Sequence, residues 1–346
     1  MPSAYVPPEL ENWALDQLSV GSGGREGRLT PLAGDASNRC YYRLDTPGER
    51  YIVAEAPPAT EKNEAFIDIR HKLDLAGIKV PRIFAADLVN GYLLLEDLGD
   101  SLLLPLLTAE NVNGYYRRAM DVLQLMALAP AVEPLLPDYD KAILTEELER
   151  FPEWFVEGLL GYGLTPPDRL ILEAIWRLLI ENALEQPRVM VHRDFHSRNL
   201  MVQGSGELAV IDFQDAVTGP LTYDLVSLLK DCYIHWPVDR VRGWALSHRD
   251  ALQAAGRIES VDDGPFMRWF DWMGLQRHIK VLGTFARLYL RDGKPTYLQD
   301  LPLVVRYVRG VAAEYASEEP AFAAFCSWFD TVLAPRIAAQ SWSSAP

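Results

Sequence analysis

The sequence predicts an α+β fold with two lobes, a small one built on an antiparallel sheet and a larger one made mostly of helices. Short β-type runs separated by turn residues dominate residues 28–98. Long stretches with helical periodicity follow them. The composition changes after Leu98-Gly99, so we expect one lobe at 1–98 and the other at 99–346. A chain of 346 residues is long enough to bury a core in each lobe.

The small lobe is predicted from strands that alternate with one main helix. The expected elements are a short amphipathic helix at 9–20, strands at Cys40–Leu44 and Tyr51–Ala56, a helix at Glu61–Ala76, and strands at Arg82–Leu88 and Tyr92–Asp97. Asn90-Gly91 between the last two strands is a strong hairpin signal. This order predicts a small antiparallel sheet with one helix laid on it.

The large lobe is predicted to be helical. The expected helices span 108–129, 139–150, 167–184, 222–235, 238–255, 266–291, 300–317 and 319–332. Short β-type runs at Val189–Val191, Leu200–Val202 and Leu208–Ile211 interrupt them. The polar residues between these runs are therefore expected to lie in loops.

Charge and composition exclude several classes of partner. Thirty-three Lys and Arg residues against 48 Asp and Glu residues give a net charge of −15, which argues against a nucleic acid or an anionic membrane. No apolar stretch is long enough to span a bilayer, and the N-terminus lacks the pattern of a secretion signal. The three cysteines are scattered, so we expect reduced thiols in a cytoplasmic protein.

Two neighbouring motifs, VHRDFHSRN at 191–199 and AVIDFQDA at 209–216, concentrate ionisable groups between β-type runs. Asn199 and Asp212 supply an amide and a carboxylate oxygen, the ligands that Mg²⁺ prefers. Asp194 lies in the same loop, where it could accept a proton from a hydroxyl group. Together they match the requirements of phosphoryl transfer. The alternative is that all three residues only cap turns.

These motifs resemble the catalytic loop and metal motif of the protein-kinase-like fold, and above all the aminoglycoside and choline phosphotransferases. GPLTYDL at 219–225 and LLLEDLG at 93–99 extend the resemblance, which covers roughly residues 28–315. It implies Asp194 as catalytic base, Asn199 and Asp212 as Mg²⁺ ligands, His192 as a structural brace and ATP as co-substrate. It also implies that the backbone of an inter-lobe hinge at Glu96, Asp97 and Leu98 holds adenine.

The expected phosphate loop departs from the pattern of protein kinases. It comprises Gly34, Asp35, Ala36, Ser37, Asn38 and Arg39, with a single glycine. Small residues let backbone N–H groups approach phosphate, although such a segment could also be an ordinary turn. The third strand lacks the usual lysine and has Ala54 and Glu55 instead. Either Arg39 or Mg²⁺ replaces that lysine, or the chain is an inactive pseudokinase; the presence of Asp194, Asn199 and Asp212 favours an active enzyme.

The segment at 271–302, together with GDASNR and LLKDCY, resembles one subgroup, the bacterial anomeric kinases of N-acetylmuramate and N-acetylglucosamine. The resemblance implies transfer from ATP to the C1 hydroxyl, giving the α-1-phosphate in cell-wall sugar recycling. The partners expected are thus a small amino sugar and ATP. The residues alone indicate a small-molecule kinase, so an aminoglycoside- or choline-type kinase remains an alternative, as does a pseudokinase.

The substrate contacts are predicted from the large lobe. Asp231 and Tyr233, expected on the helix after the metal motif, could bind sugar hydroxyls, or could serve as caps or core residues. Arg277 begins a cationic stripe at helical spacing, with Lys280, Thr284, Arg287 and Arg291. A lactyl carboxylate would need such a cation, and Arg277 is our candidate. The alternative is a solvated helix face.

Overall fold

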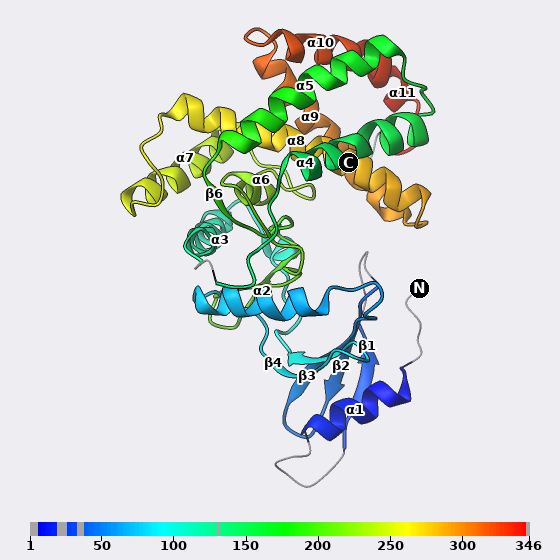
Figure 1. The fold of residues 1–346 in the computed structure, drawn as a ribbon, viewed down its shortest axis with the longest axis vertical. Coiled ribbons are helices and arrows are strands. Elements are labelled where there is room, and N and C mark those ends of the chain that lie inside the picture. Colours follow the sequence, from blue (N-terminus) through cyan, green and yellow to red (C-terminus); the bar gives the residue numbers. More distant parts are fainter. Residues whose placement is uncertain (1–5, 19–25, 33–37, 130–131, 344–346) are drawn as a thin grey trace. The chain divides into compact units, whose positions relative to one another are not determined.

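The computed structural model of the chain describes residues 6–18, 26–32, 38–129 and 132–343 (Figure 1). The chain forms two compact units, and each contains more than one stretch of sequence. The first unit comprises Met1–Leu106, Ala129–Leu135 and Arg198–Asp215, and the second comprises Leu107–Leu128, Leu136–Ser197 and Ala216–Pro346. The division of the chain into lobes at 1–98 and 99–346 stays a prediction, because each compact unit consists of several separate stretches of sequence.

The first unit contains the predicted antiparallel sheet. Its elements are α1 (Pro8–Leu18), β1 (Arg28–Pro31), β2 (Cys40–Asp45), β3 (Arg50–Glu55), α2 (Asn63–Leu75), β4 (Ile83–Asp87) and β5 (Tyr92–Glu96). The sheet has five strands in the order β1-β2-β3-β5-β4, and every neighbouring pair is antiparallel. The hairpin predicted at Asn90-Gly91 is confirmed, with a loop at residues 88–91.

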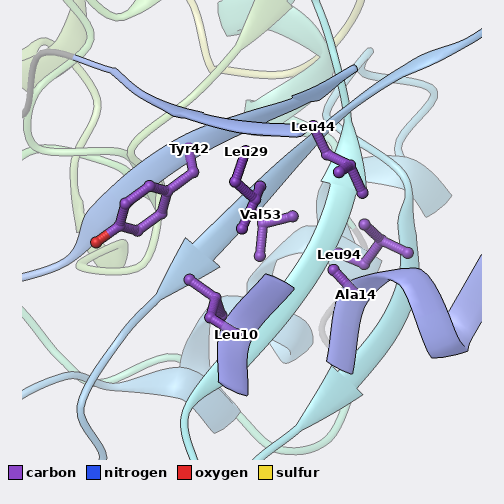
Figure 2. Packing of buried hydrophobic residues seen from close by; sticks show 7 residues of the cluster. All are labelled: Leu10, Ala14, Leu29, Tyr42, Leu44, Val53 and Leu94. Carbon is purple, nitrogen blue, oxygen red and sulfur yellow. The ribbon is translucent and has the colours of Figure 1, made fainter. Parts of the chain in front are cut away.

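Helix α1 covers one face of this sheet (Figure 2). The buried cluster consists of Leu10 and Ala14 of α1 with Leu29, Tyr42, Leu44, Val53 and Leu94 of the strands. Burial of these apolar side chains, at about 25 cal/mol per Å², is what holds the helix on the sheet. Because side chains alternate along a strand, residues 41 and 43 project from the opposite face of β2. The N-terminal helix thus leaves that second face available for other residues of the unit.

A small hairpin completes the part of the first unit that bears on the site. Strands β7 (Leu200–Val202) and β8 (Leu208–Val210) pair with each other, and the short 3₁₀ helix η1 (Leu104–Leu106) precedes them in the chain. The Leu103 amide donates to the Leu200 carbonyl at 2.8 Å, and the Val202 amide donates to the Ser101 carbonyl at 2.7 Å. Met201 and Ala209 form a buried cluster with Leu98. The hairpin is thereby fixed to the segment that follows β5.

The second unit is mainly helical, as predicted. Its helices are α3 (Val112–Ala127), α4 (Lys141–Arg150), the π-helix η2 (Phe151–Leu159), α5 (Pro166–Glu185), α6 (Tyr223–Leu229), α7 (Val238–Ala254), α8 (Asp263–Leu290), the 3₁₀ helix η3 (Pro295–Asp300), α9 (Leu301–Tyr315), α10 (Pro320–Trp328), the π-helix η4 (Phe329–Leu333) and α11 (Ala334–Ala338). Strands β6 (Arg188–Val191) and β9 (Val217–Pro220) form a separate antiparallel pair. The sequence did not predict β9, η2, η3 or α11.

The helix predicted at 222–235 is wrong at its end, because α6 stops at Leu229. Asp231 and Tyr233 therefore lie beyond the helix rather than on it. The reason is visible in the hydrogen bonds of Asp231. Its carboxylate accepts from the Tyr233 amide at 3.1 Å, a local bond that competes with helix continuation.

Helix α8 is the centre of the second unit and contacts α4, η2, α5, α6 and α9 (Figure 1). It spans 28 residues and is buried on most of its circumference. Gly283 allows the closest approach, because a Cβ there would lie 2.3 Å from the Arg150 carbonyl carbon and 2.6 Å from the Phe151 amide nitrogen. The absence of a side chain at Gly283 thus sets the distance between α8 and the junction of α4 with η2.

We expect Gly283→Ala to lower the free energy of unfolding by about 1–3 kcal/mol, since neither backbone can move aside without disturbing other contacts. The matched control is Gly243→Ala on α7, where an added Cβ meets no atom within 4 Å. That change should raise stability by about 0.5–1 kcal/mol, because alanine favours helix over glycine. Thermal unfolding of both variants checks the pair, and equal behaviour would contradict the packing argument.

Candidate active site

The loop between β6 and β7 contains the HRDFHSRN motif, and the buried carboxylate of Asp224 holds its first half. The backbone amides of His192 and Arg193 donate to this carboxylate at 2.6 and 3.1 Å. Arg193 has a φ of 78°, a left-handed conformation that costs a non-glycine residue about 1–2 kcal/mol. Burial raises the pKa of Asp224 to about 6, although the two amide bonds and His192 oppose it. The loop conformation therefore depends on this one side chain.

Asp231 holds the second half of the loop. Its carboxylate accepts from the Ser197 amide at 3.0 Å and from the Ser197 hydroxyl at 2.5 Å. The Asp231 side chain is buried. Its Oδ2 accepts both bonds from Ser197, and its Oδ1 accepts the bond from the Tyr233 amide. Asp231 is thus a brace of the loop. The Tyr233 ring lies against His196 and Phe285, with centroids 5.4 and 6.4 Å away. The sugar contacts predicted for Asp231 and Tyr233 stay predictions.

Asp194 lies between these two anchors with an exposed side chain. Its backbone amide donates to His192 Nδ1 at 3.2 Å, which agrees with a bracing role for the buried His192. Desolvation by the surrounding atoms would raise the pKa of Asp194. The positive charges of Lys280, His196, Arg277 and Arg193 outweigh this effect and lower the pKa to about 2. Asp194 is therefore a carboxylate at neutral pH, able to accept a hydrogen bond or a proton from a hydroxyl group.

The first two cations of the stripe on α8, Arg277 and Lys280, do not form a solvated face. Arg277 is buried, and its guanidinium donates to Cys232 Sγ at 3.3 Å. Lys280 is also buried and pairs with Glu147 at 2.9 Å. The solvated-face alternative is thus wrong for these two residues, whereas Arg291 at the end of the helix is exposed and pairs with Asp292. Helical spacing alone could not show which elements cover this face.

Asn199 and Asp212 come together at the β7–β8 hairpin of the first unit. Asn199 Nδ2 lies 3.5 Å from Asp212 Oδ2, and the Ile211 amide donates to the Asn199 carbonyl at 3.1 Å. Asp212 has a φ of 63°, and Gln214 Nε2 donates to its Oδ1 at 2.8 Å. An amide and a carboxylate oxygen on one hairpin fit a Mg²⁺ site whose remaining ligands are water and phosphate. Asp194 belongs to the second unit, so the structure joins two of the three predicted residues.

Of the predicted phosphate loop, Gly34, Asp35, Ala36 and Ser37 lie outside the described residues. Asn38 is exposed, and its amide donates to the Glu61 carboxylate at 3.2 Å. The Arg39 side chain is buried rather than extended into solvent. Its guanidinium lies 3.7 Å from the Glu61 carboxylate, donates to Asn63 Oδ1 at 3.3 Å and lies 4.7 Å over the Phe66 ring. The turn before α2 and its first residues thus orient Arg39.

Arg39 occupies the face of the sheet where the missing lysine would be expected. Tyr41 pairs with Ala54 across β2 and β3, and Arg39, one residue before β2, hydrogen-bonds the Tyr41 side chain on this face. Burial raises the pKa of the Tyr41 hydroxyl, and the negative charges of Asp212 and Glu61 raise it further. The positive charge of Arg39 and its hydrogen bond to Tyr41 act in the opposite direction. Tyr41 therefore lies within electrostatic reach of both Arg39 and the metal motif.

Other side chains connect α2 with the metal motif. Phe66 stacks on Phe213, the residue after Asp212, with centroids 4.8 Å apart. Lys62, the first lysine after β3, is exposed and forms an ion pair with Asp215 at 2.6 Å. Its side chain therefore points to the segment after Asp212. No local sequence pattern predicts these connections, because each joins residues about 150 positions apart in the chain.

The predicted hinge residues use their side chains within the protein. The Glu96 carboxylate binds Lys79 Nζ at 2.6 and 2.8 Å, and the Asp97 carboxylate binds Arg43 at 2.9 and 3.2 Å. Leu98 is buried, and its carbonyl accepts from Gln203 at 3.2 Å. Adenine binding by the backbone of this segment stays a prediction. None of the helices in the described part of the chain has the length and apolar character that crossing a membrane requires.

Sequence comparisons give the family and its relatives. The model of the phosphotransferase enzyme family matches residues 28–270. The N-acetylmuramate/N-acetylglucosamine kinase of Pseudomonas putida is 44% identical over 285 residues, which cover 82% of this chain and 84% of that protein. The protein of the same name from Neisseria meningitidis is 37% identical over 319 residues, which cover 91% of this chain and 93% of that protein.

The structure is similar to solved kinases of the same type. The choline kinase LicA from Streptococcus pneumoniae has a TM-score of 0.61 at 16% identity, covering 88% of this chain and 99% of that one. The ADP-bound aminoglycoside phosphotransferase APH(2'')-Ib has a TM-score of 0.58 at 12% identity, covering 87% and 98%. At such identities the likeness shows the fold alone, and it confirms the predicted α+β, protein-kinase-like fold.

Proposed function

This chain belongs to the phosphotransferase enzyme family, and from that premise we propose that it phosphorylates the anomeric C1 hydroxyl of N-acetylmuramate and N-acetylglucosamine. The enzyme is an ATP-dependent phosphotransferase, and relatives that match most of its length are named for both sugars. The product would be the α-1-phosphate, and the role would lie in the recycling of bacterial cell-wall sugars. These finer points rest on the resemblance of the chain to that subgroup.

The residues present are those that a direct transfer needs. The C1 oxygen forms a bond to the γ-phosphorus of ATP, the bond from that phosphorus to the bridging oxygen breaks, and ADP leaves with the electron pair. Asp194 would orient the hydroxyl and receive its proton. A carboxylate with a pKa of about 2 is a weak base, which suits a loose transition state where the proton moves late. Asn199 and Asp212 would hold Mg²⁺, which neutralises phosphate charge when bound.

We base the choice of acceptor on the charges around Asp194. The cations that lower its pKa include Lys280, Arg277 and Arg193. The carboxylates nearby, Glu147, Asp224 and Asp231, are buried and directed at donors inside the protein. A polycationic aminoglycoside or choline needs carboxylates that face the acceptor, whereas a neutral or anionic sugar does not. This environment favours the amino sugars over the acceptors named in the solved structures.

The pseudokinase alternative is the second candidate, because β3 lacks the lysine of active kinases. Two observations favour activity. Asn199 and Asp212 lie within 3.5 Å of each other on one hairpin, and Arg39 projects from the sheet face that would have held the lysine. Asp194 is also ionised and lies in a loop that two buried carboxylates hold in place, as a catalytic base requires.

An ADP-release assay against N-acetylmuramate, N-acetylglucosamine, an aminoglycoside and choline tests the proposal. We expect turnover with both sugars, none with the two cations, and loss of activity in EDTA. Phosphorylation at C1 also removes the reducing end, which a reducing-sugar assay detects. Turnover with the cations would support the first alternative, and nucleotide binding without transfer to any acceptor would support a pseudokinase.

Asp194→Asn should keep the fold and the affinity for ATP while lowering kcat by a factor of about 10²–10⁴, because the amide cannot accept the proton. Steady-state kinetics and thermal unfolding measure the two effects. Asp121→Asn on the exposed face of α3 is the control and should change neither. Near-normal turnover of a folded Asp194 variant would remove Asp194 from the role of base.

Arg39→Ala should weaken ATP binding by about 1–3 kcal/mol, the value of a charge-assisted hydrogen bond. The KM for the sugar should stay nearly constant, since the phosphate loop belongs to the nucleotide site. Lys62→Met is the matched control, because Lys62 is exposed and pairs with Asp215. If Arg39→Ala destabilises the protein but leaves the affinity for ATP unchanged, the guanidinium serves only to join β2 to α2.

Arg277→Ala should raise the KM for N-acetylmuramate and leave that for N-acetylglucosamine nearly unchanged, because the lactyl carboxylate is present in the first sugar alone. A desolvated pair of this kind is worth about 1.5–3 kcal/mol. Arg291→Ala, at the exposed end of the same helix, is the control. An equal effect on both sugars, accompanied by a lower unfolding temperature, would instead indicate that the buried Arg277 is structural.

A further inference from the structure

We propose that Lys280 is a positioning residue of the phosphotransfer site, which acts on Asp194 through the buried carboxylate of Glu147 and through its own charge. The inference rests on the proposed function, because it assigns Asp194 a role in the reaction. Lys280 lies on α8 and is 8% exposed. Its Nζ lies 2.9 Å from Glu147 Oε1 and donates to the Tyr223 hydroxyl at 2.9 Å. The ammonium group is thus fixed from two sides.

Glu147 on α4 gathers donors from three parts of the second unit. Besides Lys280, it accepts from Arg193 Nη2 at 2.5 Å and from the Tyr139 hydroxyl. Glu147 is 1% exposed, so these donors replace the water that its carboxylate would otherwise bind. Removal of any one donor leaves the buried carboxylate with fewer hydrogen bonds, which costs free energy. The network therefore has one preferred arrangement.

This network reaches the catalytic loop through Arg193, the neighbour of Asp194 in the chain. Asp224 binds the Arg193 amide, and Glu147 binds its guanidinium, so both ends of the residue are held. The left-handed φ of 78° is stable only while these contacts last. Lys280 supports that conformation indirectly, because it balances the charge of Glu147 together with Arg193.

Stability alone does not explain a buried lysine at this place. Desolvation of a buried ion pair offsets most of the attraction, and apolar residues of similar size often stabilise a protein as well or better. Lys280 also has an electrostatic effect on Asp194, and among the positive groups near Asp194 its effect on the pKa is the largest. Lys280 is thus coupled to Asp194 both through the loop backbone and through its charge.

The charged and titratable groups that face Asp194 come from several elements. They are Lys280 and Arg277 of α8, and His196 and Arg193 of the loop itself. Glu147 of α4, Tyr223 of α6 and Asp224 of α6 lie behind these groups and carry the balancing polar or negative atoms. Because Arg277 and Arg193 remain when Lys280 is removed, its loss should raise the pKa of Asp194 without neutralising the site.

The test compares Lys280→Met with the wild-type enzyme in the full chain. We expect kcat to fall about 10- to 100-fold, while the KM for ATP changes less than about 2-fold, because the residues proposed to contact the nucleotide belong to the first unit. The carboxyl group of Asp194 should titrate about one pH unit or more higher, as expected when one nearby opposite charge is lost. Carbon-13 NMR of protein labelled at aspartate carboxyls measures this directly, with Asp194→Asn to assign the signal.

Further variants separate positioning from general structural damage. Lys280→Arg keeps the charge and should restore both kcat and the titration of Asp194. Glu147→Gln removes a negative charge, so it should lower kcat without raising the pKa of Asp194. Lys230→Met is the matched control: Lys230 forms another largely buried ion pair, with Asp271 at 2.7 Å, and should cost stability without moving that titration.

An unchanged Asp194 titration in Lys280→Met, or a loss of kcat that Lys280→Arg does not restore, overturns the inference. Because the NMR titration needs no acceptor, it is informative even if none of the tested sugars is phosphorylated. Failure of the proposed function would appear as a wild-type enzyme without sugar turnover. Failure of this inference would appear as a Lys280→Met variant that titrates like the wild type.

Discussion

The site depends on the hydrogen bonds that the Asp224 carboxylate accepts from the His192 and Arg193 amides. These bonds hold the backbone of the loop at the point where Arg193 adopts a left-handed conformation. Asp231 anchors the other end of the loop through Ser197. The two buried carboxylates fix the loop from both sides and leave Asp194 exposed between them. A flexible loop of this length would lose the entropy advantage that a preorganised acceptor group provides.

We propose that Arg39 of the first unit takes the place of the lysine that β3 lacks. Arg39 projects from the same face of the sheet as Ala54, and Glu61 and Asn63 hold its guanidinium. Small Ala54 leaves room for the neighbouring side chains of β2 on that face. The stack of Phe66 on Phe213 connects this region with the metal motif. Under this proposal the cation comes from the residue before β2 rather than from β3, and its acidic partner Glu61 lies in the turn before α2.

The charges around Asp194 bear more on the choice of acceptor than the net charge of the whole chain. The net charge of −15 would suit a cationic substrate, yet the groups that act most strongly on Asp194 are cations. The nearby carboxylates are consumed by internal hydrogen bonds, so they present no negative surface to an acceptor. Because a fold alone does not fix the acceptor, the side chains around this loop are what support our proposal of a neutral or anionic sugar.

The sequence by itself determined most of the strands and helices, the motifs with Asp194, Asn199 and Asp212, and the family, because these depend on local periodicity and on short spacings. Tertiary structure decided the rest. Helical spacing identified Arg277 and Lys280 as one stripe, but only the packing of α4, α6 and the loop against α8 showed that both are buried. The same holds for Asp231, which ends up beyond α6 and bound to Ser197, a residue 34 positions away. Such contacts join segments remote in the chain, and a side chain's burial depends on those segments rather than on its own neighbours in sequence.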